Sequence, residues 1–430
     1  MKFLRLLLSL VCSVFGCPVR AAAVPPLTLA AAREQALRTH PRISVADLRA
    51  LAAREVVAEN RAGFFPLVAI NATRVDVGEQ VTRLASGSLS NSQIYDHTGV
   101  GATLGLTVTD FGRTASLVEA ARQRVRAADA DAIATRAQIL LELDAAYYHA
   151  LNAQAVKAVA AKTLAARQSL LDRTDALARN QLKSELDVRF AQVGVGEARL
   201  LVSEADEDLQ AALTTLGNLL GEAPVSAAVQ LEIPPSPADL PPDAKLLTAL
   251  ALQQRPELQR QRSEGEAARA LADAAREARL PTISVLAAAG VEPTNDAHFE
   301  HNYAAGGINI SLPIFTGGLY RARQREAELQ ADAADAALLD QQNNVVRDVR
   351  LAWLEAVQSH ERIALTTSLL ENATAALTLA RARFEQGLSS IVELNQAELA
   401  QTSADIAHAT ADYGYRVRRD LLDYTTGSLH

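Results

Sequence analysis

An internal duplication constrains this chain more than any other feature of its sequence. Positions in the two halves match at a spacing of 215 residues near the start of each half and at 206 residues farther on. The spacing changes once, within two polar, turn-rich stretches around residues 80–98 and 292–302. Two halves of similar length that repeat the same order of elements are an internal repeat. The matching pairs are Pro41 and Pro256, Arg61 and Arg276, Pro66 and Pro281, Gly112 and Gly318, Tyr147 and Trp353, Leu182 and Leu388, and Gly221 and Gly427.

Each repeat predicts a helix, two strands, a very long helix, a sharp reversal and a shorter return helix. The first repeat spans 24–221, with helix 29–61, strands 66–78 and 98–110, long helix 113–180 and return helix 184–220. The second spans 243–430, with helix 243–279, strands 281–292 and 304–315, long helix 319–386 and return helix 390–422. The proline-rich segment 222–242 cannot continue a helix and is expected to link the repeats at an equatorial level. Helices of about 100 Å must pack along partners, so an elongated, mainly helical fold is expected.

The predicted strands alternate between apolar residues and small or polar ones. In strand 98–110, Val100, Ala102, Leu104, Leu106 and Val108 share one face, and glycines and threonines occupy the other. A half-buried sheet on a soluble core is one interpretation, although both faces lack bulky interior residues. A membrane β-barrel, with apolar side chains toward lipid and polar ones toward a lumen, fits better. Four strands cannot close, so copies of the chain would have to complete the barrel.

The N-terminus resembles a secretory signal peptide. Residues 1–23 combine basic residues, an apolar run and a final run of alanines. Their removal takes away Lys2, Arg5 and Arg20 and moves the formal charge from −8 to −11, so the composition does not favour a nucleic-acid partner. Both cysteines, Cys12 and Cys17, lie in this region. Acylation of Cys17 after an alternative lipoprotein-type cleavage is the competing interpretation. No other apolar run reaches the roughly 20 residues of a membrane-spanning helix.

The chain resembles the TolC-type outer-membrane efflux proteins over nearly all of its mature length. The resemblance rests on the duplicated order of elements and on short motifs at equivalent places: TDFGR (109–113), FTGGL (315–319), FEQG (384–387) and VEL (392–394). It implies a homotrimer in the outer membrane, with a 12-stranded barrel continued by a 12-helix periplasmic tunnel. It also implies contact with outer-membrane lipid, a periplasmic adaptor protein and an inner-membrane transporter of RND, ABC or MFS type.

Each helical reversal carries an acid just after the turn. Ser184 and Asp187, and likewise Ser390 and Glu393, have the spacing of a capping box, which alone would explain both acids. The resemblance implies that these turns form the periplasmic mouth of the tunnel, where the family carries an aspartate pair. Glu393 occupies the first of those positions, and Gln396 departs from the pattern at the second. The predicted pore constriction is therefore Glu393, Gln396 and Asp187.

The residues at the two tips are expected to contact the adaptor: Asn180, Gln181, Leu182 and Lys183 on the first turn, and Gln386, Gly387, Leu388 and Ser389 on the second. Ser389 stands where the best-known member of the family has an arginine that helps to lock the entrance, and Asp187 matches the acid that this arginine binds. Any lock in this chain must use other partners, and Lys183 is available nearby.

The sequence offers no constellation typical of an enzyme or a cofactor site. It has no phosphate-binding glycine loop, no nucleophile with a plausible base and no metal-ligand cysteine spacing. The stretch from Asp296 to His301 is interpreted as a polar external loop rather than a metal site. The predicted function is a passive exit channel of a tripartite efflux or type I secretion system. The alternative is a periplasmic coiled-coil adaptor or scaffold without a barrel. The sequence does not define the cargo.

Overall fold

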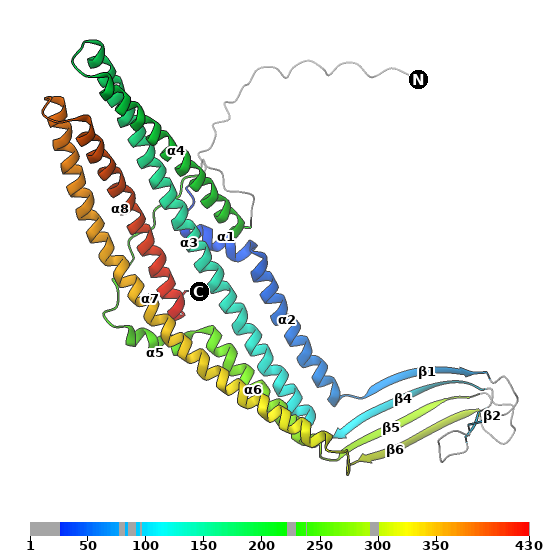
Figure 1. Cartoon of the computed structure of the whole chain (residues 1–430). Coiled ribbons are helices and arrows are strands. Elements are labelled where there is room, and N and C mark those ends of the chain that lie inside the picture. The colour runs from blue at the N-terminus through cyan, green and yellow to red at the C-terminus, as the bar shows by residue number, and fades with distance from the viewer. Residues whose placement is uncertain are drawn as a thin grey trace, which may run out of the picture.

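A computed structural model of the chain describes residues 26–76, 82–84, 92–94, 97–221, 229–237, 239–292 and 301–429. The predicted signal peptide with both cysteines, and the stretch from Asp296 to Glu300, lie outside these residues. The described part has an elongated helical body with a β-sheet extending from one end (Figure 1). The predicted fold class, a duplicated and mainly helical chain with a β portion, is confirmed.

The two halves contain the same α-helices and the same long strands in the same order. The first half has α1 (Leu29–Thr39), α2 (Pro41–Arg61), the short 3-10 helix Ala62–Phe64, β1 (Leu67–Val75), β4 (His97–Thr109), α3 (Arg113–Arg179) and α4 (Glu185–Leu219). The second half has α5 (Ala244–Gln254), α6 (Pro256–Glu277), β5 (Thr282–Val291), β6 (Asn302–Ser311), α7 (Leu319–Glu385) and α8 (Ile391–Thr426). The long helices α3 and α7 each contain 67 residues.

Two sequence predictions about these elements were wrong. The predicted helices 29–61 and 243–279 are each broken in two, at His40 and at Arg255, whose ψ angles of 121° and 123° are extended. The cause is the proline that follows each of them, because proline disfavours the helical region for the residue before it. The predicted loop 80–98 also contains a small antiparallel pair, β2 (Thr82–Leu84) with β3 (Ser92–Ile94).

Each long helix packs beside two shorter helices that follow one another along its length. In Figure 1, α4 lies along the half of α3 that points away from the sheet, and α2 lies along the other half. α8 and α6 lie beside α7 in the same way, and α3 also contacts α6 and α8, which joins the two repeats. An 18-residue window of α7 reaches a mean hydropathy of 1.2, enough by length and composition alone to cross a bilayer.

The equatorial segments are held by one aromatic residue from each repeat. The hydroxyl of Tyr147 donates to the carbonyl oxygens of Leu27 and Glu232, at 2.6 and 2.7 Å. The indole Nε1 of Trp353, at the matching position, donates to the carbonyl of Pro241 at 2.9 Å. Tyr147 and Trp353, which match in the two repeats, thus each pin the linker to a long helix.

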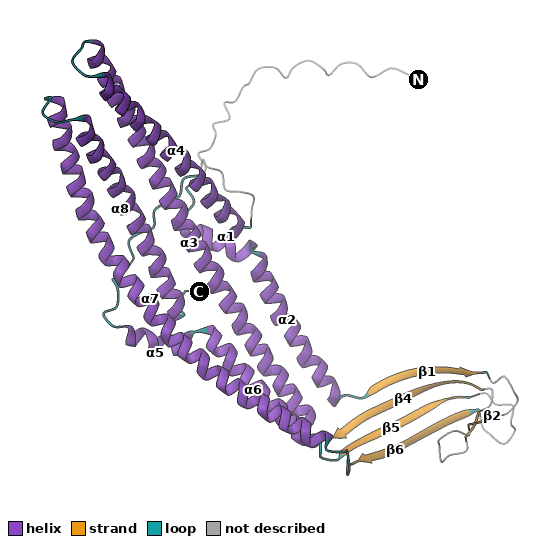
Figure 2. Cartoon of the chain, in the orientation of Figure 1, coloured by secondary structure: helices purple, strands orange, loops and turns teal. Residues whose placement is uncertain are grey.

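The four long strands form one antiparallel sheet in the order β1-β4-β5-β6 (Figure 2). Cross-strand partners lie on the same face, and the register pairs Val68 with Leu104, Leu104 with Ala287 and Val285 with Ile308. The apolar positions predicted strand by strand therefore merge into one continuous face. Ile308 on this face is 73% exposed in the single subunit. The opposite face carries small and polar side chains, including the pair Asn71 and Thr103.

Candidate functional site at the helical tips

The two helical reversals lie at the end of the body that is farthest from the sheet (Figure 1). The turn between α3 and α4 spans 180–184, and the turn between α7 and α8 spans 386–390. Both turns lie at the same end of the molecule because α3 and α7 have the same length and both start at the sheet. All the tip residues predicted from sequence are on these turns, and most of their side chains are exposed.

Both long helices end in the same hydrogen-bonded motif. The amide of Leu182 donates to the carbonyl of Leu177 at 2.9 Å, and the amide of Leu388 donates to that of Arg383 at 2.8 Å. This is the Schellman motif, which needs one residue in the left-handed conformation. Gly387 fills that position in the second turn with φ of 73°, and Gln181 fills it in the first turn with φ of 60°. The exposed side chains of Leu182 and Leu388 then project from the ends of the tips.

Exchanging residue types at the two left-handed positions is expected to have opposite effects. Gln181→Gly should stabilise the first hairpin and Gly387→Ala should destabilise the second, each by about 1 kcal/mol, because a Cβ is disfavoured at positive φ. No atom lies within 4 Å of a Cβ built on Gly387, so the backbone alone decides the result. Amide hydrogen exchange at the two tips would measure both changes, and two changes of the same sign would contradict this explanation.

The two acids behind the turns have different partners. Ser184 and Asp187 form a complete capping box: the serine hydroxyl accepts from the Asp187 amide at 3.2 Å, and Asp187 Oδ2 accepts from the Ser184 amide at 3.1 Å. Ser390 also accepts from the amide of Glu393, at 3.3 Å. The carboxylate of Glu393, however, lies 3.5 Å from Arg383 Nη1 on α7. Asp187 is thus committed to its helix start, and the Glu393 carboxylate is not.

The structure does not bring the three predicted constriction residues together within one subunit. Asp187 lies on α4, while Glu393 and Gln396 lie on α8. Gln396 is exposed, and Glu393 is half-buried beside Arg383. Any ring of these residues around a pore would have to contain side chains from several subunits.

Two contacts join the tips of the two hairpins. Arg173 on α3 forms an ion pair of 3.1 Å with Glu385 on α7. The Lys183 ammonium lies 3.9 Å from the centre of the Phe384 ring, a cation–π contact. Lys183 was singled out from sequence as available for a lock. Its partner is an aromatic ring rather than an acid, and Phe384 belongs to an apolar cluster with Ile391 and Leu394 that is shared between the hairpins.

A buried ion pair lies deeper between the hairpins. Arg167 on α3 and Glu398 on α8 are both about 6% exposed, and Arg167 Nε lies 3.0 Å from Glu398 Oε2. Arg167 Nη1 also donates to the side chain of Asn395 at 2.7 Å. Gly194 on α4 leaves the space that the guanidinium fills, since a Cβ there would lie 2.9 Å from Arg167 Nη1. This pair could not be predicted from the sequence, because nothing in the sequence spacing relates residues 167 and 398.

Comparison with curated proteins identifies bacterial relatives, several of which are named as outer membrane proteins of efflux pumps. The chain is 28% identical over 312 residues to the outer membrane protein OprJ of Pseudomonas aeruginosa, which covers 69% of this chain and 63% of OprJ. It is 26% identical to the solvent efflux pump outer membrane protein SrpC of Pseudomonas putida, covering 72% of this chain and 66% of SrpC. The protein CyaE of Bordetella pertussis is 28% identical, over 76% of this chain and 68% of CyaE. The alignments with OprJ and SrpC therefore span slightly less than two thirds of those relatives.

Solved structures share the fold over nearly the whole chain. The outer membrane protein VceC of Vibrio cholerae superimposes with a TM-score of 0.79 at 20% identity, covering 93% of this chain and 96% of VceC. The CmeC outer membrane channel of Campylobacter jejuni gives a TM-score of 0.80 at 16% identity, covering 93% of this chain and 85% of CmeC. The family described as outer membrane efflux protein matches residues 32–222 and 247–428. This match covers most of both repeats, so the chain belongs to the outer membrane efflux protein family.

Proposed function

We propose that this protein is an outer-membrane exit channel, formed when copies of the chain share one β-barrel. The observation that carries the proposal is the four-stranded sheet. It has one continuous apolar face that is exposed in the single subunit, and its outer strands β1 and β6 have no partner on their free sides within the described residues. Unpaired strand edges are costly in lipid, at several kcal/mol for each buried unsatisfied group. Copies of the chain that add their sheets edge to edge satisfy those groups.

Closure by three copies gives the 12-stranded barrel of a homotrimer in the outer membrane. The apolar face then contacts lipid, and the face with Asn71 and Thr103 lines a polar lumen. The helices of three subunits continue the barrel as a periplasmic tunnel. Their tips, with Leu182 and Leu388 exposed, are placed to meet a periplasmic adaptor and through it an inner-membrane transporter. The channel has no catalytic step of its own, and the partners set its cargo.

A periplasmic adaptor or scaffold without a barrel is the second candidate. It would need the apolar face of the sheet to be covered by protein rather than lipid. No described helix lies over the sheet, which extends away from the helical body (Figure 2). Membership of the chain in the outer membrane efflux protein family also supports the channel. An adaptor would be recovered from the periplasm as a soluble protein, and a channel would be recovered from outer membranes as a heat-modifiable oligomer.

Glu393→Ala is expected to lower the preference of the channel for cations. One acid per subunit at a narrow mouth attracts cations, and its removal leaves Arg383, 3.5 Å away, without its partner. The ratio of cation to anion permeability should fall at least about twofold, as read from reversal potentials in planar bilayers. Glu207→Ala, at an exposed position on α4, is the control. Unchanged selectivity in the Glu393 variant would remove this residue from the mouth.

A further inference from the structure

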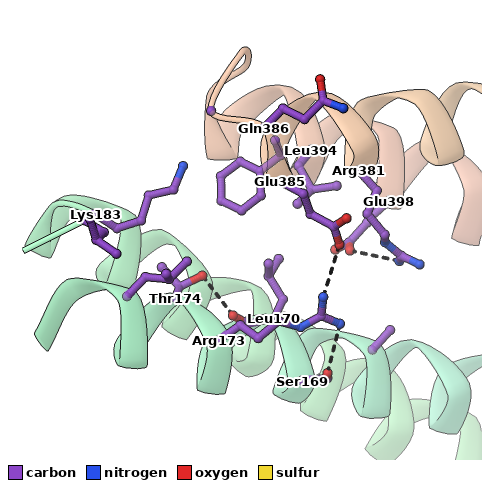
Figure 3. Close-up of a pocket in the computed structure, with 15 residues that line it drawn as sticks. Ser169, Leu170, Arg173, Thr174, Lys183, Arg381, Glu385, Gln386, Leu394 and Glu398 are labelled. Carbon is purple, nitrogen blue, oxygen red and sulfur yellow. Dashed lines mark hydrogen bonds and ion pairs between the residues drawn. The ribbon is translucent and has the colours of Figure 1, made fainter. Parts of the chain in front are cut away.

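A cavity of about 590 Å³ lies between the two helical tips of a single subunit. Figure 3 shows its two walls facing each other: Leu170, Arg173, Thr174 and Lys183 come from the first hairpin, and Arg381, Glu385, Leu394 and Glu398 come from the second. The volume falls within the range of about 300–1,000 Å³ that is typical of small-molecule sites. Neither hairpin forms the cavity alone, so its shape depends on how far apart the hairpins lie.

The middle of the cavity is apolar. Leu170 and Leu177 on α3 face Phe384 on α7 and Leu394 on α8. Phe384 and Leu394 are 6% and 1% exposed, so they form a fixed wall, and Leu177 is 37% exposed. This lining suits a flat hydrophobic group, which would replace water against aromatic and aliphatic carbon.

Basic side chains outnumber acidic side chains in the lining of the cavity. Glu385 is paired with Arg173 at 3.1 Å, and Glu398 is compensated by Arg167 at 3.0 Å and by Arg381 at 3.6 Å. Lys183 is the remaining basic residue of the lining. Among the residues that the structure describes, no carboxylate lies within ion-pair distance of its ammonium, whose recorded contact is the Phe384 ring. The lining therefore carries an excess positive charge beside an aromatic wall.

We propose that this cavity binds an amphipathic organic anion, with an aromatic or aliphatic body and one carboxylate or sulfonate group. The body lies between Leu177, Phe384 and Leu394, and the anionic group accepts hydrogen bonds from Lys183. A charge-assisted bond of this kind is about twice as strong as a neutral one and selects an acid over its uncharged ester. The apolar body alone would bind without that selection.

The position of the cavity gives such a ligand a second effect, which rests on the proposed function. Both contacts that join the tips, Arg173 with Glu385 and Lys183 with Phe384, border the cavity. A ligand that touches both walls favours the spacing seen here, in which these contacts are made. Separation of the hairpins widens the cavity and weakens binding. The bound anion therefore holds the tips together and lowers conductance.

Photolabelling with 4-benzoylbenzoate tests the site on the full protein in detergent. The probe has two aromatic rings and one carboxylate, and its methyl ester is the matched uncharged ligand. Saturable labelling should map to peptides from 166–183 and 381–398. Lys183→Met keeps the apolar stem of the lysine and should reduce labelling at a fixed probe concentration at least about fivefold. Lys245→Met removes an exposed lysine on α5 and should leave labelling unchanged.

Labelling outside these peptides, equal labelling of Lys183→Met, or equal labelling by the ester would each overturn the proposal. A separate recording in planar bilayers, with and without the probe, examines the effect on conductance. Protein that is labelled at the cavity but forms no channel would disprove the proposed function and keep the site. Channels that conduct but are not labelled would disprove the site and keep the proposed function.

Discussion

Glu398→Ala is expected to destabilise the association of the two hairpins by about 3–5 kcal/mol, the cost of removing one partner from a buried ion pair. The guanidinium of Arg167 would stay buried with Asn395 as its remaining polar partner on α8. The midpoint of guanidinium chloride unfolding, followed by circular dichroism in detergent, measures the change. Because Arg167 lies on α3 and Glu398 on α8, the loss falls on the contact between the repeats.

Glu385→Ala is the matched control, since Glu385 also pairs with an arginine of α3. The Arg173–Glu385 pair is exposed, with side chains 64% and 54% accessible, so its loss should cost less than about 1 kcal/mol. Replacing both Arg167 and Glu398 by methionine should recover much of the loss, because no buried charge then remains unpaired. Equal effects of the two glutamate substitutions would contradict the assignment of Arg167–Glu398 as the stronger link.

Asp420→Asn is expected to stabilise the protein at pH 8 and to flatten its pH dependence. Asp420 lies on α8 near the equator, and one of its carboxylate oxygens is buried without a hydrogen-bond partner. Burial and the nearby negative charge of Asp144 raise the pKa of Asp420 to about 7, although Arg33 on α1 acts to lower it. Tyr148 from α3 also faces this carboxylate, as do Arg419 and Asp423 from α8 itself.

The sign of the effect follows from the raised pKa. The folded protein binds the Asp420 proton more tightly than the unfolded chain does, since the ordinary pKa is 3.8. The stability that this proton confers is fully present below about pH 4 and is lost as the pH rises through about 7. Between pH 5 and pH 8 the wild-type protein should lose on the order of 2 kcal/mol through this group, and Asp420→Asn should not.

Arg33 is already committed to Asp144, which explains why it does not neutralise Asp420. Its Nε and Nη2 donate to the two oxygens of Asp144 at 2.8 and 2.6 Å. Denaturation midpoints at pH 5 and pH 8 would be compared for wild type, Asp420→Asn and the exposed-site control Asp208→Asn. If Asp420→Asn loses as much stability as wild type between the two pH values, Asp420 is ionised throughout this range and the explanation is wrong.

The repeated order of elements could be predicted from sequence because each signal is local. Long stretches without proline or glycine set α3 and α7, and alternation sets the sheet faces that the register then joins. The breaks at His40 and Arg255 could also have been found. Pro41 and Pro256 were recognised as matching positions, and the effect of proline on the preceding residue predicts a break at both.

The contacts between hairpins could not be predicted in this way. Arg173 and Glu385 are 212 residues apart, and their meeting depends on the relative rotation of two long helices, which no local pattern encodes. The same holds for Lys183 and Phe384. The capping-box spacing, by contrast, predicted the partner of Asp187 and failed for the carboxylate of Glu393. Arg383 on the preceding helix competes for that carboxylate with a charge that the Ser390 amide lacks.

Native mass spectrometry of the protein extracted from outer membranes tests the central claim most directly. In the proposed channel, the four-stranded sheet, whose outer strands have free edges within the described residues, is completed by other subunits, and a barrel of twelve strands requires three of them. We predict a complex of three times the mass of the mature subunit that dissociates only on heating. A soluble single subunit, with its apolar sheet face and strand edges satisfied on its own, would contradict the account.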